Sequence, residues 1–314
     1  MGVGGVSAVL EAERLTKRYG ERRGVEEVSL TVGPGEVFGF LGANGAGKTT
    51  VIRMMLDLIR PTSGRLRVLG EEPARAPGIR RRIGYLPGEL VLEGRQRGAS
   101  FLHFLAGVRG GVPRERIEGL AERLNVDLSV RLRDLSKGNK QKVGLIQAFM
   151  HEPSLLILDE PTSGLDPLVQ QEFLAMVREA RDAGQTVFMS SHVLAEVQHV
   201  AGRVGVLRQG RLVTVREVSA LTERTLRKVE VRFEDEVPLT AFEEVPGVRE
   251  ASIADNVLHC AVEGSMDPLV KALAAFPVRD LVSERPDLED SFLDYYEQHT
   301  ETERGGSSAV SRDA

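Results

Sequence analysis

A glycine-rich run early in the chain has the residue types and spacing of a phosphate-binding loop. It reads Gly-Ala-Asn-Gly-Ala-Gly-Lys-Thr over residues 42–49 and matches the pattern G-x-x-x-x-G-K-S/T. Glycines let backbone N–H groups turn toward phosphate oxygens, and the following helix points its positive end at the same place. We expect Lys48 to reach the β- and γ-phosphates and the Thr49 hydroxyl to bind Mg²⁺. The predicted nucleotide contacts here are Gly42, Ala43, Asn44, Gly45, Ala46, Gly47, Lys48, Thr49 and Thr50.

Two adjacent carboxylates follow a short apolar run later in the chain. Leu155–Leu158 leads directly into Asp159 and Glu160, as expected for a buried parallel strand that ends in acids. Many buried strands end in this way, so these acids gain a specific meaning only from the phosphate loop upstream. In that context we expect Asp159 to hold Mg²⁺ through water and Glu160 to orient and polarise an attacking water.

Three further motifs occur at Leu135–Gln141, Ser163–Asp166 and Ser191-His192. With the loop and the acids they make five motifs in one order, and over about residues 9–220 this set resembles the nucleotide-binding subunit of an ATP-binding-cassette (ABC) transporter. The resemblance implies an α/β P-loop NTPase fold with an inserted helical subdomain at about 88–150. It also implies an ATPase that uses ATP and Mg²⁺ and works as a homodimer or pseudo-dimer.

The resemblance also implies roles for single residues. The signature sequence, which in the family binds the γ-phosphate of ATP held by the opposite subunit, comprises Ser136, Lys137, Gly138 and Asn139. Asp166 stands in the loop that passes between two active sites, and His192 would contact the γ-phosphate and hold the water with Glu160. Tyr19 stands where the family stacks an aromatic ring on adenine. Taken singly, these residues could instead be a helix cap at Ser136, a solvated histidine and a surface aromatic.

Two places depart from the family's pattern. Lys137 replaces the first of two adjacent glycines in the signature and Asn139 replaces its glutamine, while Gly138 remains for backbone recognition of phosphate. At Gly88 the family usually has a glutamine that touches Mg²⁺ and relays the nucleotide state to the membrane partner. Glycine has no side chain for this, so Glu89 either substitutes for the glutamine or is simply solvated, and the sequence leaves both open.

The elements that must position these residues alternate between strand and helix, which predicts a parallel sheet with helices on its faces. The signature is expected to start a helix over 140–151, within a mostly helical stretch at 95–150. The other expected strands are 9–15, 25–32, 36–41, 64–70, 155–158, 186–190 and 204–207, and the other expected helices are 50–56, 167–182 and 193–201.

The pattern changes around 213–228, where we expect a second unit. Its strands and helices follow a β-α-β-β-α-β order that resembles a small ferredoxin-like module. The expected elements are strand 229–233, helix 239–245, strands 248–254 and 257–262, helix 268–276, strand 278–283 and a final amphipathic helix at 288–298. The predicted domains are therefore an ATPase domain at 8–220, a regulatory or dimer-contact α+β module at 225–300 and a disordered tail at 301–314.

Composition limits the classes of partner. The chain has 314 residues and a formal net charge of −5, so a general nucleic-acid binder is not expected. No apolar run approaches the roughly 18 residues of a membrane-spanning helix, so a permease would be a separate chain. The single cysteine, Cys260, excludes an intrachain disulfide, fits a reducing compartment and is expected in the core.

The end of the chain also resembles bacterial drug- and antibiotic-exporter subunits. The function predicted is therefore ATP hydrolysis that energises a separate permease for export of drugs, antibiotics or other amphipathic small molecules, at the cytoplasmic face of the cell membrane. An importer subunit, or a soluble ATPase of the same family acting on ribosomes or nucleic acid, remain the alternatives.

Overall fold

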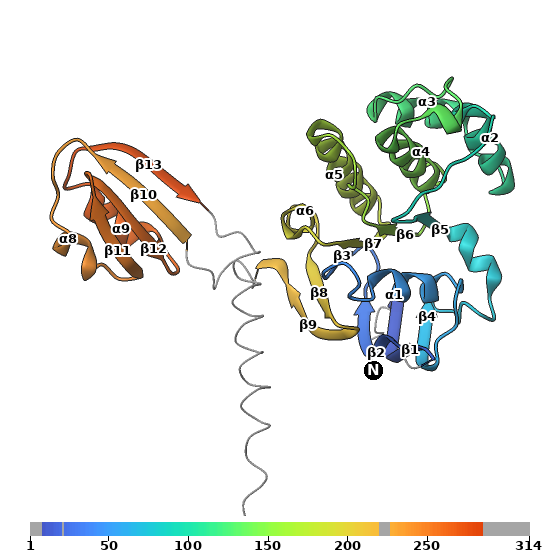
Figure 1. The fold of residues 1–314 in the computed structure, drawn as a ribbon, viewed down its shortest axis with the longest axis horizontal. Helices are drawn as coiled ribbons and strands as arrows, with labels where there is room; N and C mark the ends of the chain where they lie inside the picture. The colour runs from blue at the N-terminus through green and yellow to red at the C-terminus, as the bar shows by residue number, and fades with distance from the viewer. Residues whose placement is uncertain (1–7, 21, 220–226, 285–314) are drawn as a thin grey trace, which may run out of the picture. The chain divides into compact units, whose positions relative to one another are not determined.

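The computed structural model describes residues 8–20, 22–219 and 227–284. The chain divides into two compact units, Met1–Glu217 and Val218–Ala314, each of which is described by itself (Figure 1). The predicted helix at 288–298 and the predicted tail at 301–314 lie outside the described residues. Within the described ranges, none of the helices combines the length and apolarity that a membrane crossing requires.

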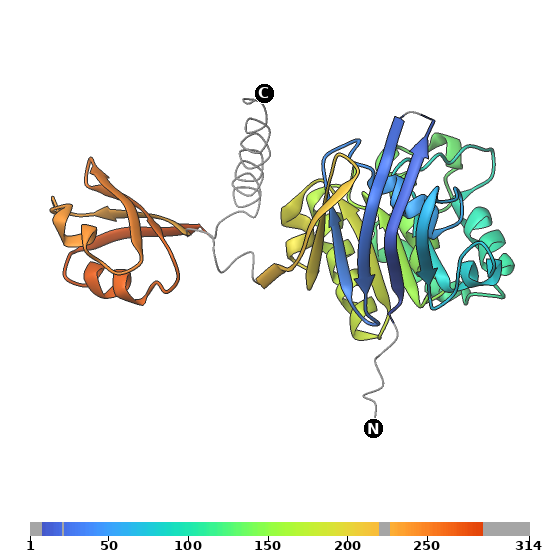
Figure 2. The ribbon, with the colours of Figure 1, turned by 90° about the horizontal axis from the view of Figure 1, so that it is seen from below.

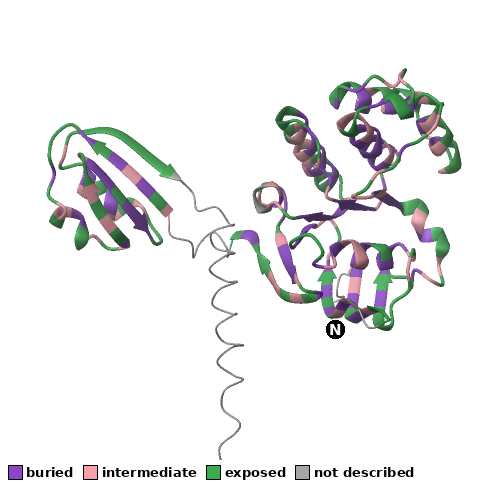
Figure 3. Ribbon diagram, in the orientation of Figure 1, coloured by how far each residue is buried: buried purple, intermediate pink, exposed green. Residues whose placement is uncertain are grey.

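A six-stranded sheet with the order β5-β6-β7-β3-β8-β9 forms the centre of the first unit. Its strands are β3 (Val37–Leu41), β5 (Ile83–Leu86), β6 (Leu155–Asp159), β7 (Thr186–Ser191), β8 (Arg203–Arg208) and β9 (Arg211–Glu217). All neighbours pair in parallel except β8 and β9, which are antiparallel. Strands β6 and β7 are buried along their length, which explains the apolar runs Leu155–Leu158 in β6 and Val187–Met189 in β7 (Figure 3). Residues 211–217 form the edge strand β9 of this sheet.

A second, antiparallel sheet holds the two N-terminal strands. Its order is β2-β1-β4, with β1 (Leu10–Tyr19), β2 (Arg22–Val32) and β4 (Ser63–Val68), and Figure 2 shows β1 and β2 as long neighbouring strands in blue. Helix α1 (Lys48–Met55) contacts β2, β4 and β6, so it lies between the two sheets. One hydrophobic cluster therefore spans both sheets and buries the helix that follows the phosphate loop.

The predicted helical stretch lies beside the β5–β6 edge of the central sheet (Figure 1). It contains α2 (Gly98–Val108), α3 (Arg114–Arg123) and α4 (Lys137–Phe149). Helix α4 begins three residues before the predicted start at 140, because the Ser136 hydroxyl accepts a hydrogen bond from Asn139 N at 3.2 Å and caps the helix. Helix α5 (Pro167–Asp182) packs against β7, and the short α6 (Leu194–Gln198) follows that strand.

A half-buried arginine–histidine contact anchors β5 to the ends of helices α2 and α4. Arg109 Nη1 donates to Ile83 O at 3.1 Å and lies 2.6 Å from His151 Nε2, which must accept because a guanidinium only donates. Burial, and next the charge of Arg109, lower the pKa of His151 to about 4. Because Ile83 is the first residue of β5, this contact holds the start of that strand.

The lowered pKa of His151 predicts a pH-dependent stability. In the unfolded chain the imidazole takes up a proton below pH ~6.5, whereas in the folded chain it stays neutral down to about pH 4. The unfolded state then binds more protons, so the free energy of unfolding falls as the pH decreases through this window. Between pH 7.5 and pH 5, a His151→Gln variant should lose about 1 kcal/mol less stability than the parent protein, allowing for solvent screening.

Urea unfolding at the two pH values measures this difference. The matched control is His103→Gln, because His103 is an exposed histidine on α2. Equal losses in the parent protein and in His151→Gln would contradict the prediction.

The second unit has a four-stranded antiparallel sheet with two short helices. Its strands are β10 (Arg227–Phe233), β11 (Val248–Ala254), β12 (Val257–Val262) and β13 (Val278–Glu284), in the order β11-β12-β10-β13. Helices α8 (Thr240–Glu243) and α9 (Asp267–Leu273) occur after β10 and β12. Phe233, Phe242 and Phe276 pack with ring centroids 5.7 to 6.1 Å apart. Cys260 lies in this core, as expected, and burial raises the pKa of its thiol.

Candidate active site

The phosphate loop runs from the end of β3 into the first turn of α1. Gly45 and Gly47 have φ values of 81° and 109°, in the left-handed region that glycine adopts without strain. A Cβ atom on Gly47 would lie 2.6 Å from Val25 Cγ1, so the loop also needs glycine for close packing. Gly47 is the N-cap of α1 and provides no capping side chain, which leaves the first backbone N–H groups of the helix for a ligand.

Lys48 is buried at the base of this loop. Its side chain is 6% exposed, and Nζ donates to Gly42 O at 2.5 Å and to Ala43 O at 3.3 Å. The ammonium also lies 3.0 Å from Glu160 Oε1. The buried cation is therefore held by loop carbonyls and by the carboxylate of Glu160, directly after β6, and it has the position to bind an anion in the loop.

Asp159 ends β6 beside the phosphate loop. Thr49 Oγ1 donates to Asp159 Oδ2 at 2.8 Å, and Ser190 Oγ donates to Asp159 Oδ1 at 2.5 Å. The Ser190 hydroxyl also accepts from Glu160 N at 3.1 Å. A hydroxyl and a carboxylate oxygen at this distance are hard oxygen ligands of the kind that Mg²⁺ takes, so the donors present suit that ion.

Glu160 and His192 meet next to this pair. His192 Nδ1 lies 2.6 Å from Glu160 Oε2, and because an ionised carboxylate only accepts, Nδ1 carries the proton. Glu160 has φ 48°, a sparsely populated conformation for a residue with a side chain. Its Oε1 is buried and makes no hydrogen bond within the described ranges, although the ammonium of Lys48 lies 3.0 Å away. One carboxylate thus contacts the loop lysine and the histidine after β7.

The signature residues lie apart from this group. Ser136 caps α4, and a Cβ on Gly138 would lie 2.7 Å from Gly164 O, so the start of α4 packs against the loop before α5. Asp166 caps α5 by accepting from Val169 N at 3.1 Å. Across the described ranges, residues 136–139 make no hydrogen bond or ion pair to the phosphate loop.

The remaining predicted positions border the site. The Tyr19 ring packs on Gly24, and Gly24 O in turn lies 3.0 Å from the Cβ position of Gly47, which brings the exposed tyrosine near the phosphate loop. A Cβ on Gly88 would lie 3.3 Å from the Asp159 carboxylate, so this backbone does reach the acid. Glu89 is exposed, and its side chain makes no hydrogen bond or ion pair with another described residue.

Comparisons with known proteins agree with this geometry. A family model described as ABC transporter matches residues 25–163. The bacitracin transport ATP-binding protein BcrA of Enterococcus faecalis is 38% identical over 231 residues, which cover 72% of this chain and 75% of that protein. The chain belongs to the ABC transporter family.

Two further similarities extend the comparison. The Nod factor export ATP-binding protein I of Paraburkholderia xenovorans is 32% identical over 90% of this chain and 91% of its own length. A solved structure of an ATP-binding subunit of an ABC transporter matches with a TM-score of 0.63 and 31% identity, over 68% of this chain and 91% of that one. This ABC chain is accordingly an ATPase with the P-loop NTPase fold.

Two residues of this ABC site were not predicted from the sequence. Ser190 bonds both acids, and Gln141 Nε2 on α4 donates to Pro161 O at 3.0 Å, directly after Glu160. Both side chains are buried, at 0% and 5% exposure. The role of Ser190 could have been suspected from the sequence, because it is a polar residue at the end of an apolar strand. The contact of Gln141 could not, because it depends on how α4 packs.

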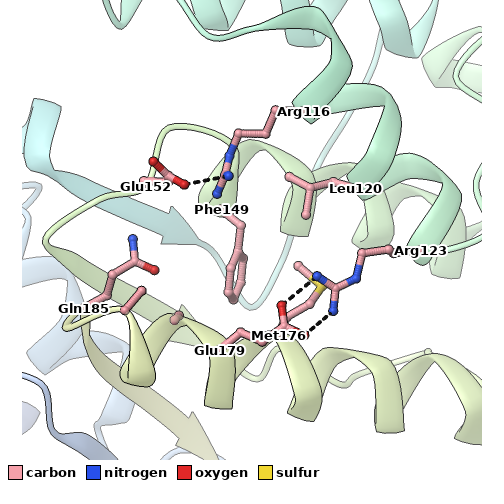
Figure 4. Close-up of a pocket in the computed structure, with 10 residues that line it drawn as sticks. Arg116, Leu120, Arg123, Phe149, Glu152, Met176, Glu179 and Gln185 are labelled. Carbon is pink, nitrogen blue, oxygen red and sulfur yellow. Dashed lines mark hydrogen bonds and ion pairs between the residues drawn. The ribbon is translucent and has the colours of Figure 1, made fainter.

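A cavity of about 370 Å³ lies elsewhere in the ABC fold, between α3, the end of α4 and α5 (Figure 4). Its charged groups are paired with one another: Arg116 with Glu152 at 2.6 Å, and Arg123 with Glu179 at 2.7 Å. The predicted site residues do not line it. The candidate active site is therefore the group around Lys48, and this cavity is separate from it.

Proposed function

We propose that this chain is the ATP-hydrolysing subunit that energises a separate membrane permease for export of drugs, antibiotics or other amphipathic small molecules. The joint contact of Lys48, Glu160 and His192 carries the proposal, because it provides the groups that hydrolysis requires. Of the two relatives above, one is named for bacitracin transport and the other for Nod factor export, and the second is similar over 90% of this chain.

The phosphate loop is proposed to bind the triphosphate of ATP. Its backbone N–H groups and the N-terminus of α1 surround the phosphates, Lys48 reaches the β- and γ-phosphates, and the Tyr19 ring stacks on adenine. Thr49 and Asp159 are proposed to hold Mg²⁺, which when bound neutralises charge on the β- and γ-phosphates. The hydrogen bond between these two residues supports a shared place for the ion.

Hydrolysis is assigned to Glu160 and His192. Glu160 orients a water molecule and accepts its proton as the water oxygen bonds the γ-phosphorus and the bond to ADP breaks. His192 donates Nδ1–H to Glu160, and its other ring nitrogen is directed at the γ-phosphate. The 2.6 Å contact between the two side chains supports this division of roles.

A head-to-tail homodimer or pseudo-dimer is proposed to complete each site. Residues 136–139 present a capped helix N-terminus, a sound place for a phosphate, yet they make no contact with the phosphate loop of their own chain within the described ranges. In the dimer they bind the γ-phosphate of the ATP held by the partner. Asp166, next to this helix start, is assigned to the contact between the two sites.

The second unit is proposed to be a ferredoxin-like module that regulates the ATPase or contacts the dimer partner. Its β-α-β-β-α-β order and sheet order β11-β12-β10-β13 support that architecture. The chain as a whole is assigned to the cytoplasmic face of the cell membrane, held there by its permease and without a nucleic-acid partner.

The permease contact is assigned to the helical subdomain around α2. Phe104 and Val108 are one helical turn apart and are 67% and 63% exposed. Val91, in the segment after Glu89, is 72% exposed. Exposed apolar side chains on α2 and in the segment that follows Gly88 suit a protein–protein contact that senses the nucleotide.

An affinity pull-down from detergent-solubilised membranes of the native host tests the proposal. The tagged chain should recover a stoichiometric polytopic membrane protein, identified by mass spectrometry. Phe104→Asp should reduce that recovery by roughly tenfold, as expected for an aromatic side chain that becomes buried against the permease. It should leave basal ATP hydrolysis unchanged. Leu58→Asp is the control, because Leu58 is an exposed leucine outside the helical subdomain. Recovery of ribosomal proteins or nucleic acid in the soluble fraction would contradict the permease.

A further inference from the structure

Glu196 on α6 joins two segments that carry active-site residues. Its Oε2 accepts a hydrogen bond from Thr162 Oγ1 at 2.6 Å and lies 3.1 Å from Ser191 Oγ, whose single proton it shares with Val193 O at 3.0 Å. Thr162 and Ser191 are buried, at 5% and 1% exposure. A buried hydroxyl needs an acceptor, and a carboxylate is the strongest acceptor among protein side chains.

The two hydroxyls are close in sequence to the hydrolytic pair. Thr162 follows Glu160 by two residues, and Ser191 directly precedes His192. One carboxylate oxygen therefore ties the segment after β6 to the segment after β7. The Glu160 and His192 side chains, which meet at 2.6 Å, lie on these same two segments.

Packing alone does not hold this pair in place. The His192 side chain is 50% exposed, so few neighbours restrict its rotation. Glu160 has φ 48°, a conformation that persists only when its surroundings maintain it. Ser191 Oγ also accepts from Val193 N at 2.9 Å, so the turn at His192 already depends on the hydroxyl that Glu196 binds.

We propose that Glu196 is a positioning residue for ATP hydrolysis, which holds the segments of Glu160 and His192 at the spacing that their contact needs. This inference rests on the roles proposed above for those two residues. Glu196 itself binds two hydroxyls of the protein, so its loss should lower the rate of the chemical step and leave nucleotide affinity nearly unchanged.

The first test compares variants of the carboxylate and of one of its donors. Glu196→Ala should lower kcat roughly tenfold, since it removes a charge-assisted acceptor, with the ATP dissociation constant within about twofold of the parent value. Glu196→Gln retains an oxygen that accepts both hydroxyls, so it should lose less. Thr162→Val should share the kcat defect, and Thr162→Ser should restore most of the rate. Glu172→Gln, which changes a carboxylate paired with Arg123, should have the parent rate.

A double-mutant cycle with His192 decides whether the effect passes through the active site. Single-turnover rates are measured for Glu196→Ala, His192→Ala and the double variant, with thermal melts to verify folding. Because Glu196 acts through the contact of Glu160 with His192, Glu196→Ala should lower the single-turnover rate little further once His192 is alanine. The role of Glu196 would be overturned if Glu196→Ala lowered the rate of the His192→Ala protein as much as it lowers the parent rate. An unchanged kcat in Glu196→Ala and Thr162→Val would overturn it as well. A parent rate in His192→Ala would instead overturn the role proposed for His192.

Discussion

Replacing Glu160 with glutamine should lower ATP turnover by roughly 10²- to 10⁴-fold, the contribution of a positioned general base. The same variant should accumulate as an ATP-bound dimer. In the parent protein the Glu160 carboxylate contacts both Lys48 Nζ at 3.0 Å and His192 Nδ1 at 2.6 Å, and glutamine has nearly the same shape. The variant therefore keeps the site's geometry while losing the proton acceptor.

Loss of charge explains the trapped dimer. A carboxylate beside the phosphate loop repels the γ-phosphate, and the neutral amide removes that repulsion, so the closed state with ATP gains stability while its exit by hydrolysis is blocked. Gel filtration with ATP and Mg²⁺ measures the association state, and phosphate release measures turnover. Glu152→Gln is the control, since Glu152 pairs with Arg116 away from the site. A Glu160→Gln protein that stays monomeric with saturating ATP would contradict the proposed dimer.

Replacing Lys48 with alanine should weaken ATP binding by about 100-fold and reduce turnover further. An ammonium that contacts phosphate in a buried site is worth roughly 2–3 kcal/mol, which corresponds to a factor of this size. Lys48 is 6% exposed and held by Gly42 O and Ala43 O, so no solvated cation can take its place. Its loss also leaves the buried Glu160 Oε1 without its only charged neighbour among the described residues.

Fluorescent-nucleotide titration and phosphate release measure the two effects. Arg53→Ala provides the control, because Arg53 is an exposed cation in the last turn of the same helix α1 and should leave both quantities unchanged. ATP affinity within threefold of the parent value in Lys48→Ala would show that the loop does not bind phosphate through this side chain.

The structure agrees with the sequence most closely where neighbouring residues set the local conformation. The loop at 42–49 does link β3 to α1, and Asp159 does end a buried strand. These features depend on glycine conformations and on an apolar run, which operate over a few residues of sequence. The starts of α4 and α5 are local in the same way: Ser136 and Asp166 cap them, and α4 was predicted to start three residues later than it does.

The pairing of strands could not be predicted from neighbouring residues. Strands were expected at 9–15 and 25–32, but the place of β1 and β2 in a separate antiparallel sheet with β4 follows from partners far along the chain. Strand β9 was missed, because residues 211–217 alternate weakly and pair only with β8. Apolar patterns show that a strand is buried and do not show which strand lies beside it.

Local sequence thus defines an ATPase phosphate loop, its acidic strand end and its family. The contacts that bring these residues together into one site form only in the folded chain. Parallel pairing of β6 with β7 brings Ser190 to Asp159 and His192 to Glu160, across about thirty residues of chain. Glu196 reaches Thr162 in the same way. Hydrogen bonds between such distant side chains need positions within a few tenths of an ångström, and only the packed sheet and its loops supply them.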